Sequence, residues 1–219
     1  AMEQFFEPIF IARHEAMSQD LTLTNQEQTL AAISALCALG NHDFLKSYIE
    51  YALSETLNIE EIQEAILQCY LFAGFPAAIE GFIVLQTVLQ QDFVALSAKA
   101  ENNIDLWREQ GKALCKKVYA ENYDKMLENI EQLNPDLADW MLVEGYGKTL
   151  SRKGLDAKTR ELCAVTTLAV LGWQRQLFSH CKGAINCGAT KEDVHGALSI
   201  AELFKPKVLD RFQSVLNRI

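Results

Sequence analysis

Apolar residues recur along most of the chain at spacings of three and four positions, which is the period of helices that bury one face. No stretch alternates apolar and polar residues over the length of a β-strand. The pattern therefore predicts an all-α fold. The expected helices cover residues 5–17, 21–40, 43–53, 59–73, 77–100, a segment through Trp107 and Cys115, 123–132, 137–150, 157–172, a segment through Leu177 and Ile185, 191–204 and a last segment toward Ile219.

Residues that favour helix ends stand between these segments. Asn58, Asp156 and Thr190 are expected to cap the helices that follow them, because short polar side chains accept hydrogen bonds from the first turn. Gly172 can adopt the left-handed conformation that closes a helix. Pro76 follows a break in the pattern and suits the first turn of a new helix. These positions fix the expected helix boundaries.

The chain repeats itself with an offset of 132 residues, so that positions 23–72 fall on positions 155–204 without a gap. The matched positions are mainly the apolar ones and the turn glycine. Two copies of one fold would share this buried face. We therefore predict two tandem repeats of one helical bundle, residues 1–100 and 101–219.

Two ionisable positions break the match, because Thr29 stands where the second copy has Glu161 and Tyr48 where it has His180. Glu161 and His180 lie on the apolar faces of consecutive predicted helices. A histidine on such a face is commonly a satisfied core residue, and Glu161 has the neighbouring Arg160 as a partner. The first copy, however, builds the same scaffold with Thr and Tyr. Because burying an unpaired carboxylate costs several kcal/mol, a pair kept in one copy only indicates chemistry.

Consecutive helices do not by themselves bring the pair into contact. At ~1.5 Å per residue, Glu161 lies roughly 13 Å above the turn that joins the two helices and His180 roughly 8 Å above it. The side chains can meet only if the helices cross, or through a bridging water. We predict that they share one mostly apolar pocket, joined directly or by one water.

Composition narrows the classes of partner. The net charge is −9, with 49% apolar and 22% charged residues, which argues against a nucleic-acid partner. No run of 18 apolar residues is present, so no membrane span is expected. The acidic start of the chain does not resemble a signal peptide, which favours a cytoplasmic protein. The six cysteines form no C-x-x-C pair and no zinc-type spacing, so reduced thiols and no metal are expected.

Several motifs together resemble the carboxymuconolactone decarboxylase family. They are Gly-Leu-Asp-Ala-Lys-Thr-Arg-Glu-Leu at 154–162, Leu-Gly at 171–172, His180, Ala-Ile-Asn-Cys-Gly-Ala-Thr-Lys-Glu-Asp-Val at 184–194, Phe-Ala-Gly-Phe-Pro-Ala-Ala at 72–78 and Tyr-Gly at 146–147. The resemblance implies an alkylhydroperoxidase D-like helical bundle that forms oligomers. Since single-repeat members form hexamers, a tandem member is expected to form a homotrimer with pseudo-sixfold repeats.

The resemblance implies a carboxy-lyase that needs no cofactor and acts on a small carboxylated, lactone-like substrate. His180 would be the general acid/base and Glu161 would orient it. The expected substrate contacts are Arg160, Trp173, Phe75 and Pro76. The Gly-Phe-Pro segment stands only in the first copy and the Glu/His pair only in the second. If neighbouring copies complete each other, the chain has one composite site.

Two alternatives remain open. The alkylhydroperoxidase D-like branch of the superfamily uses Glu, C-x-x-C and His, but its cysteine positions fall here on Trp173 and Gln176. A thiol-dependent peroxidase would therefore need other sulfurs, of which Cys181 and Cys163 are the candidates. The second alternative is a non-catalytic oligomeric scaffold that binds a small ligand.

Overall fold

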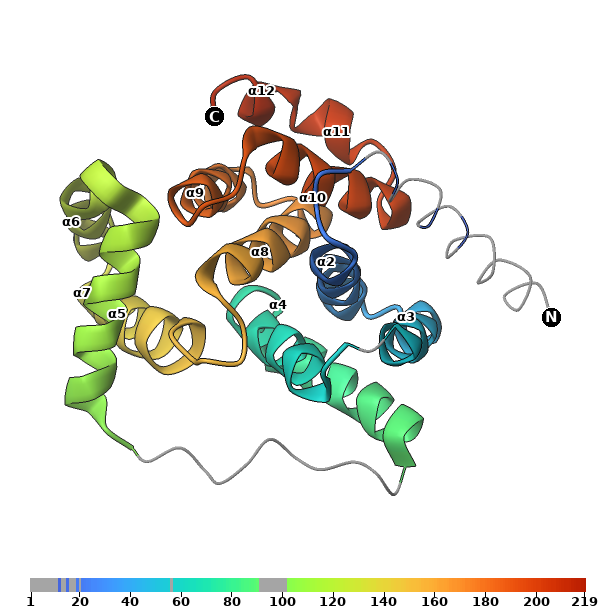
Figure 1. Cartoon of the computed structure of the whole chain (residues 1–219). Coiled ribbons are helices and arrows are strands. Elements are labelled where there is room, and N and C mark those ends of the chain that lie inside the picture. Colours follow the sequence, from blue (N-terminus) through green and yellow to red (C-terminus); the bar gives the residue numbers. More distant parts are fainter. Residues whose placement is uncertain (1–11, 13–14, 16–18, 20, 56, 91–101) are drawn as a thin grey trace.

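The computed structural model of the chain is helical throughout the part that it describes, which comprises residues 12, 15, 19, 21–55, 57–90 and 102–219 (Figure 1). The all-α prediction is confirmed. The helix predicted at 5–17 and the end of the helix predicted at 77–100 lie outside the described residues. So does the predicted boundary between the repeats at residue 100, which stays a prediction.

The observed elements follow the predicted order. They are α2 (Asn25–Leu39), α3 (His42–Ser54), α4 (Ile59–Leu89), α5 (Ile104–Tyr119), the 3-10 turn η2 (Ala120–Asn122), α6 (Tyr123–Leu133), α7 (Pro135–Trp140), the π-helix η3 (Met141–Leu150), α8 (Ala157–Leu171), α9 (Gln174–Asn186), α10 (Lys191–Phe204), α11 (Val208–Arg211) and α12 (Gln213–Leu216). Two predictions were wrong in detail. The single helix expected at 137–150 is α7 followed by a π-helix, and the last helix is two short ones.

The structure confirms the tandem repeat. Helices α8 and α9 begin and end 132 residues after α2 and α3, and α10 begins 132 residues after α4. The turn glycines agree as well, because Gly40 and Gly172 both close their helices with positive φ, 65° and 83°. Asn58 and Thr190 both cap through capping boxes. The offset read from the sequence is therefore the offset of the fold.

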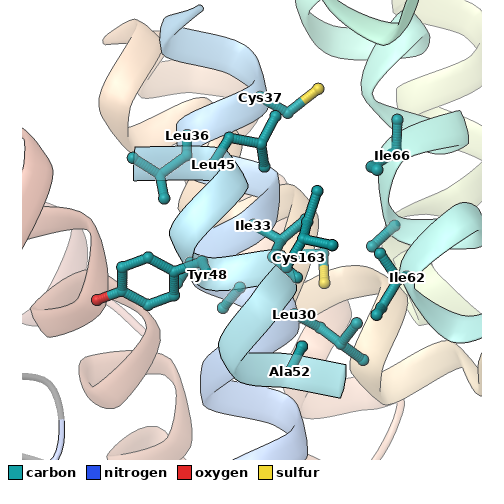
Figure 2. Packing of buried hydrophobic residues seen from close by; sticks show 14 of the residues in the cluster. Leu30, Ile33, Leu36, Cys37, Leu45, Tyr48, Ala52, Ile62, Ile66 and Cys163 are labelled. Atoms are coloured by element: carbon teal, nitrogen blue, oxygen red, sulfur yellow. The ribbon is translucent and has the colours of Figure 1, made fainter. Parts of the chain in front are cut away.

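The two copies share their cores instead of packing separately. In Figure 1, α2 and α8 lie in the middle of the molecule, between α4 and α10. The core around α2, α3 and α4 includes Leu155, Cys163 and Ile200 from the second copy; Cys163 stands among the first-copy side chains in Figure 2. The core around α8, α9 and α10 takes in Leu23 and Ala35 from the first. Residues from one copy can therefore reach a site built by the other.

Close helix packing holds η3 beside α5. A Cβ atom at Gly147 would overlap the carbonyl of Trp107, and a Cβ atom at Gly111 would overlap the carbonyl of Leu142. Only glycine permits so close an approach of the two backbones. The contact places the side chains of η3 next to those of α5, beside α8 and α9.

Helix α4 is long and apolar enough to cross a membrane by length and composition alone. Gly74, with φ 86° and ψ 165°, interrupts it, so the helix consists of the stretches 59–73 and 75–89. Each stretch is shorter than the ~20 residues that a bilayer requires. Phe75, Ile79 and Ile83 project from its second half into solvent.

Candidate functional site

Glu161 and His180 are in direct contact. Glu161 extends from α8 and His180 from α9, and the distance from His180 Nδ1 to Glu161 Oε2 is 2.8 Å. Both residues are buried, with 3% and 7% of their surface exposed. Because an ionised carboxylate only accepts hydrogen bonds, Nδ1 donates to it. The other ring nitrogen, Nε2, is then the one available to a bound molecule.

A glycine makes this contact possible. A Cβ atom at Gly183 on α9 would lie 2.6 Å from Glu161 Oε2 and 2.6 Å from Val118 Cγ1. Any side chain at this position would displace the carboxylate. With the offset of 132, the first copy has Tyr51 here. Sequence reasoning missed Gly183, although the same comparison of the copies that singled out Glu161 would have shown it.

The first copy contributes an aromatic ring to the pair. Phe72 on α4 meets the imidazole of His180 edge-on, with ring centroids 5.3 Å apart and planes at 86°. The related contact in the other copy joins Phe204 to Tyr48, at 5.4 Å and 82°. The two contacts are related by the repeat. Phe72 of the first copy covers α9 of the second copy, and Phe204 of the second copy covers α3 of the first. Phe72 begins the motif at 72–78, but the comparison of the two copies did not mark it as a neighbour of His180, because Phe204 matches it.

His180 opens onto a cavity of about 300 Å³, which we call the His180 cavity. Its walls come from both copies and from the segment between them, and they are mostly apolar and aromatic. No lysine or arginine is among the described residues that line it. The lining consists of Leu71, Phe72, Tyr119, Leu137, Trp140, Met141, Glu144, Gly145, Tyr146, Leu150 and His180.

Two tyrosines provide hydroxyl groups in this cavity. Burial raises the pKa of Tyr119 to about 12, and its ring packs against that of Tyr146 in a T-shaped arrangement, with centroids 6.2 Å apart. Burial also raises the pKa of Tyr146 well above its usual value, with a further contribution from the negative charge of Glu161. Both phenols therefore stay neutral near pH 7 and can donate hydrogen bonds. The sequence gave no signal for Tyr119, which lies outside the repeated segments.

Arg160 does not line this cavity, and its expected role in substrate binding stays a prediction. Its side chain, 1% exposed, points to α4, where Nη2 lies 2.7 Å from Glu64 Oε2 and Nη1 lies 3.2 Å from Gln68 Oε1. Glu64 also pairs with Arg152, at 2.7 Å. Adjacent helical residues point about 100° apart, so Arg160 and Glu161 contact different neighbours. Arg160 joins the two copies.

The other expected substrate contacts lie outside the cavity lining too. Trp173 is 58% exposed and precedes α9. Phe75 is 63% exposed and stacks on Tyr70, with centroids 5.0 Å apart; Pro76 is exposed beside it. Tyr70 donates to Glu144, which lines the cavity, at 3.2 Å. Phe75 is therefore a neighbour of the cavity wall and not part of it.

The candidate redox cysteines are poorly placed for thiol chemistry. Cys163 and Cys181 are fully buried, and burial raises their pKa values to about 11 and about 12. A thiol needs its thiolate form to attack a peroxide, and burial suppresses that form near neutral pH. Neither sulfur lines the His180 cavity. Among the described residues, no three His, Cys, Asp or Glu side chains are grouped to hold a metal ion.

Several known proteins are similar to this chain in sequence. The sequence matches the model of the carboxymuconolactone decarboxylase family over residues 3–87 and 135–206. It is 31% identical over 143 residues to peroxisomal protein 2 of Schizosaccharomyces pombe, covering 64% of this chain and 67% of that protein. It is 30% identical over 86 residues to 4-carboxymuconolactone decarboxylase of Acinetobacter baylyi, covering 39% of this chain and 64% of that protein. The chain thus spans less than two thirds of that decarboxylase.

Proposed function

Because the chain belongs to the carboxymuconolactone decarboxylase family, we propose that it catalyses decarboxylation or proton transfer on a small carboxylated, lactone-like substrate without a cofactor. His180 is the general acid/base, and Glu161 is the positioning residue that orients it. The observation that carries the proposal is the buried 2.8 Å contact between them beside a cavity of about 300 Å³. A cavity of this size accommodates a small organic molecule.

The chemistry follows from the positions of the donors. The bond between the substrate's ring carbon and its carboxylate breaks, CO₂ leaves, and the electron pair is delocalised onto the lactone oxygen as a dienolate. The neutral hydroxyls of Tyr119 and Tyr146 are suited to donate hydrogen bonds to that oxygen. The imidazolium of His180 then delivers its Nε2 proton to carbon and regains one from solvent. The carboxylate of Glu161 stabilises the imidazolium charge throughout.

The proposal is tested by following the loss of 4-carboxymuconolactone and related carboxylated lactones. We expect wild-type turnover and a loss of at least about 100-fold in His180→Gln and Glu161→Gln, the usual size of a general acid/base contribution. His195→Gln is the matched control, because His195 is exposed on α10, away from the His180 cavity. Turnover that survives in His180→Gln, or no turnover by the wild type on any of these lactones, would overturn the proposal.

Self-association is part of the proposal. Phe75, Ile79 and Ile83 form an exposed apolar stripe along α4, and Leu137 and Trp140 are exposed as well. Burying such a stripe against a second copy is favourable, and a trimer is the expected assembly. Light scattering tests it: a mass near three chains is expected, and Ile79→Lys with Ile83→Lys should lower it. A 24.6 kDa particle at micromolar concentration contradicts the assembly.

We also propose a cytoplasmic location. The relative in Schizosaccharomyces pombe is named a peroxisomal protein, so the two compartments are the ones to distinguish. Fluorescence of a tagged chain against markers of the cytoplasm and the peroxisome separates them. Coincidence with the peroxisomal marker would reject the proposed location.

A further inference from the structure

A second and larger hollow lies on the other side of α9. This hollow, which we call the α9 groove, has a volume of about 720 Å³ and runs between α9 and the end of α5, η2 and α6. Its lining includes Tyr119, Glu121, Lys125, Arg175, Lys182 and Lys191. Tyr119 is the residue that it shares with the His180 cavity. We propose that the α9 groove binds an organic anion with an apolar body.

The charge of the groove is opposite to that of the chain. The protein carries a net charge of −9, yet the groove lining has four basic side chains, Lys125, Arg175, Lys182 and Lys191, against one acidic side chain, Glu121, and the terminal carboxylate of Ile219. None of these four cations forms an ion pair with a carboxylate in the described part of the chain. Cations grouped without partners around a concave surface attract an anion.

The floor of the groove is suited to an apolar body. Val118 is nearly fully buried there, and Met126, Ile130, Phe178 and Ile185 are partly buried. The ring of Phe178 lies under Lys182, with Nζ 5.3 Å from its centroid, so one ligand could meet the aromatic edge and the cation together. Pockets that bind small molecules combine such apolar walls with a few charged groups and have comparable volumes.

The amphipathic character separates this site from the His180 cavity. The described lining of the cavity has no lysine or arginine, whereas that of the groove has four such side chains. Tyr119 lines both hollows, and its ring packs against that of Tyr146 in the His180 cavity. A ligand in the groove would therefore touch a residue that also faces the proposed reaction site. The inference does not depend on the proposed reaction, because it concerns binding alone.

Titration calorimetry with 2-naphthoate tests the proposal, with decanoate as a second arm to separate aromatic from aliphatic acids. We expect saturable binding of one molecule per chain. Arg175→Gln with Lys182→Gln should weaken it at least about tenfold, because the variant removes both charged partners of the carboxylate. Lys153→Gln with Lys205→Gln makes the same change in net charge outside the groove lining and should alter affinity by less than about twofold.

Two further measurements assign the site and its chemistry. Gly145→Leu fills the His180 cavity, because a Cβ atom at Gly145 meets nothing within 4 Å. Binding should survive in this variant. The neutral analogue 2-naphthalenemethanol should bind at least about tenfold more weakly than 2-naphthoate. No binding to the wild type, equal binding of the neutral analogue, unchanged affinity in the Arg175/Lys182 variant, or loss of binding in Gly145→Leu would each overturn the proposal.

Discussion

The ring of Phe72 stands edge-on to the imidazole of His180, and the two residues come from different copies of the repeat. Perpendicular ring pairs of this kind are favoured, because the electropositive edge of one ring meets the electronegative face of the other. The related contact joins Phe204 to Tyr48. The fold therefore builds two equivalent niches, each covered by the opposite copy. Only one of them contains a titratable pair.

The niche in the first copy predicts how His180→Tyr behaves. A tyrosine fits there beside Phe204, so the ring itself should be tolerated, but the change leaves the buried Glu161 without its partner. We expect a loss of about 2 kcal/mol in the free energy of unfolding, because an unpaired buried acceptor is costly. Adding Glu161→Thr, which recreates the Thr29 and Tyr48 pair, should recover at least half of the loss.

Denaturant unfolding of both variants measures this difference, and turnover should be absent from both. The comparison separates a structural from a catalytic role. If His180→Tyr alone does not fold, and the double variant does not restore folding, the imidazole is required by the core. The catalytic interpretation would then lose its main argument.

Gly183→Ala should damage the site although neither Glu161 nor His180 is substituted. The new Cβ atom would lie 2.6 Å from Glu161 Oε2, so the carboxylate must move away from Nδ1 of His180. We expect a loss of at least about tenfold in turnover and about 1–3 kcal/mol in stability, the usual cost of overpacking. Gly145→Ala is the matched control for stability, because its Cβ atom meets nothing within 4 Å. Equal activity of Gly183→Ala and the wild type would show that the position of Glu161 is not critical.

The sequence predicted those features that depend on local pattern. Periodicity and caps gave the helices, and the offset of 132 placed α2, α3 and α4 on α8, α9 and α10. The direct contact of Glu161 with His180 could only be stated as one of two outcomes, because the crossing of two helices is set by their packing. The π-helix η3 was missed. Its backbone hydrogen bonds join residues five apart instead of four, and this difference leaves no distinct spacing of apolar residues in the sequence.

The ion pair of Arg160 with Glu64 was missed for a different reason. The charge of Arg160 suggested a partner for a substrate carboxylate, and the sequence held no sign that Glu64, 96 residues away, would neutralise it. In the repeat, Gln28 stands at the position of Arg160 and Gly196 at that of Glu64, so both partners are missing together from the related position. Reading these two mismatches as a pair would have predicted the contact.

Arg160→Met should therefore destabilise the fold and spare substrate binding. Removing Arg160 leaves the buried Glu64 with Arg152 as its remaining partner, so the cost should be below the about 3–5 kcal/mol of a buried charge left without any partner. The folded fraction should keep the wild-type KM, because Arg160 does not line the His180 cavity. Arg108→Met is the control: its pair with Asp139 is open to solvent, so the change should cost much less stability than Arg160→Met. A raised KM with unchanged stability would return Arg160 to substrate binding.

Alkaline pH should destabilise the protein through its buried thiols. Burial raises the pKa values of Cys115 and Cys181 from 9.0 to about 12 and that of Cys163 from 9.0 to about 11. Below pH 9 the thiols are protonated in both the folded and the unfolded chain and contribute no pH dependence. Above it, the unfolded chain releases protons that the folded chain retains. Stability must therefore fall as pH rises, by up to about 1.4 kcal/mol per thiol and pH unit.

Denaturant midpoints between about pH 8 and pH 10 measure this fall, in a window below the ordinary pKa of tyrosine and lysine. Cys181→Ala with Cys115→Ala is the informative variant, because it removes two of the thiols and should make the midpoint less sensitive to pH. The same burial predicts that a thiol reagent modifies these cysteines only as the chain unfolds. Rapid modification of Cys181 in the folded protein near pH 8, or a midpoint that stays constant to pH 10, would contradict the raised pKa values. Either result would restore Cys181 as a candidate for peroxide chemistry, since a thiolate beside His180 would then be present in the native state.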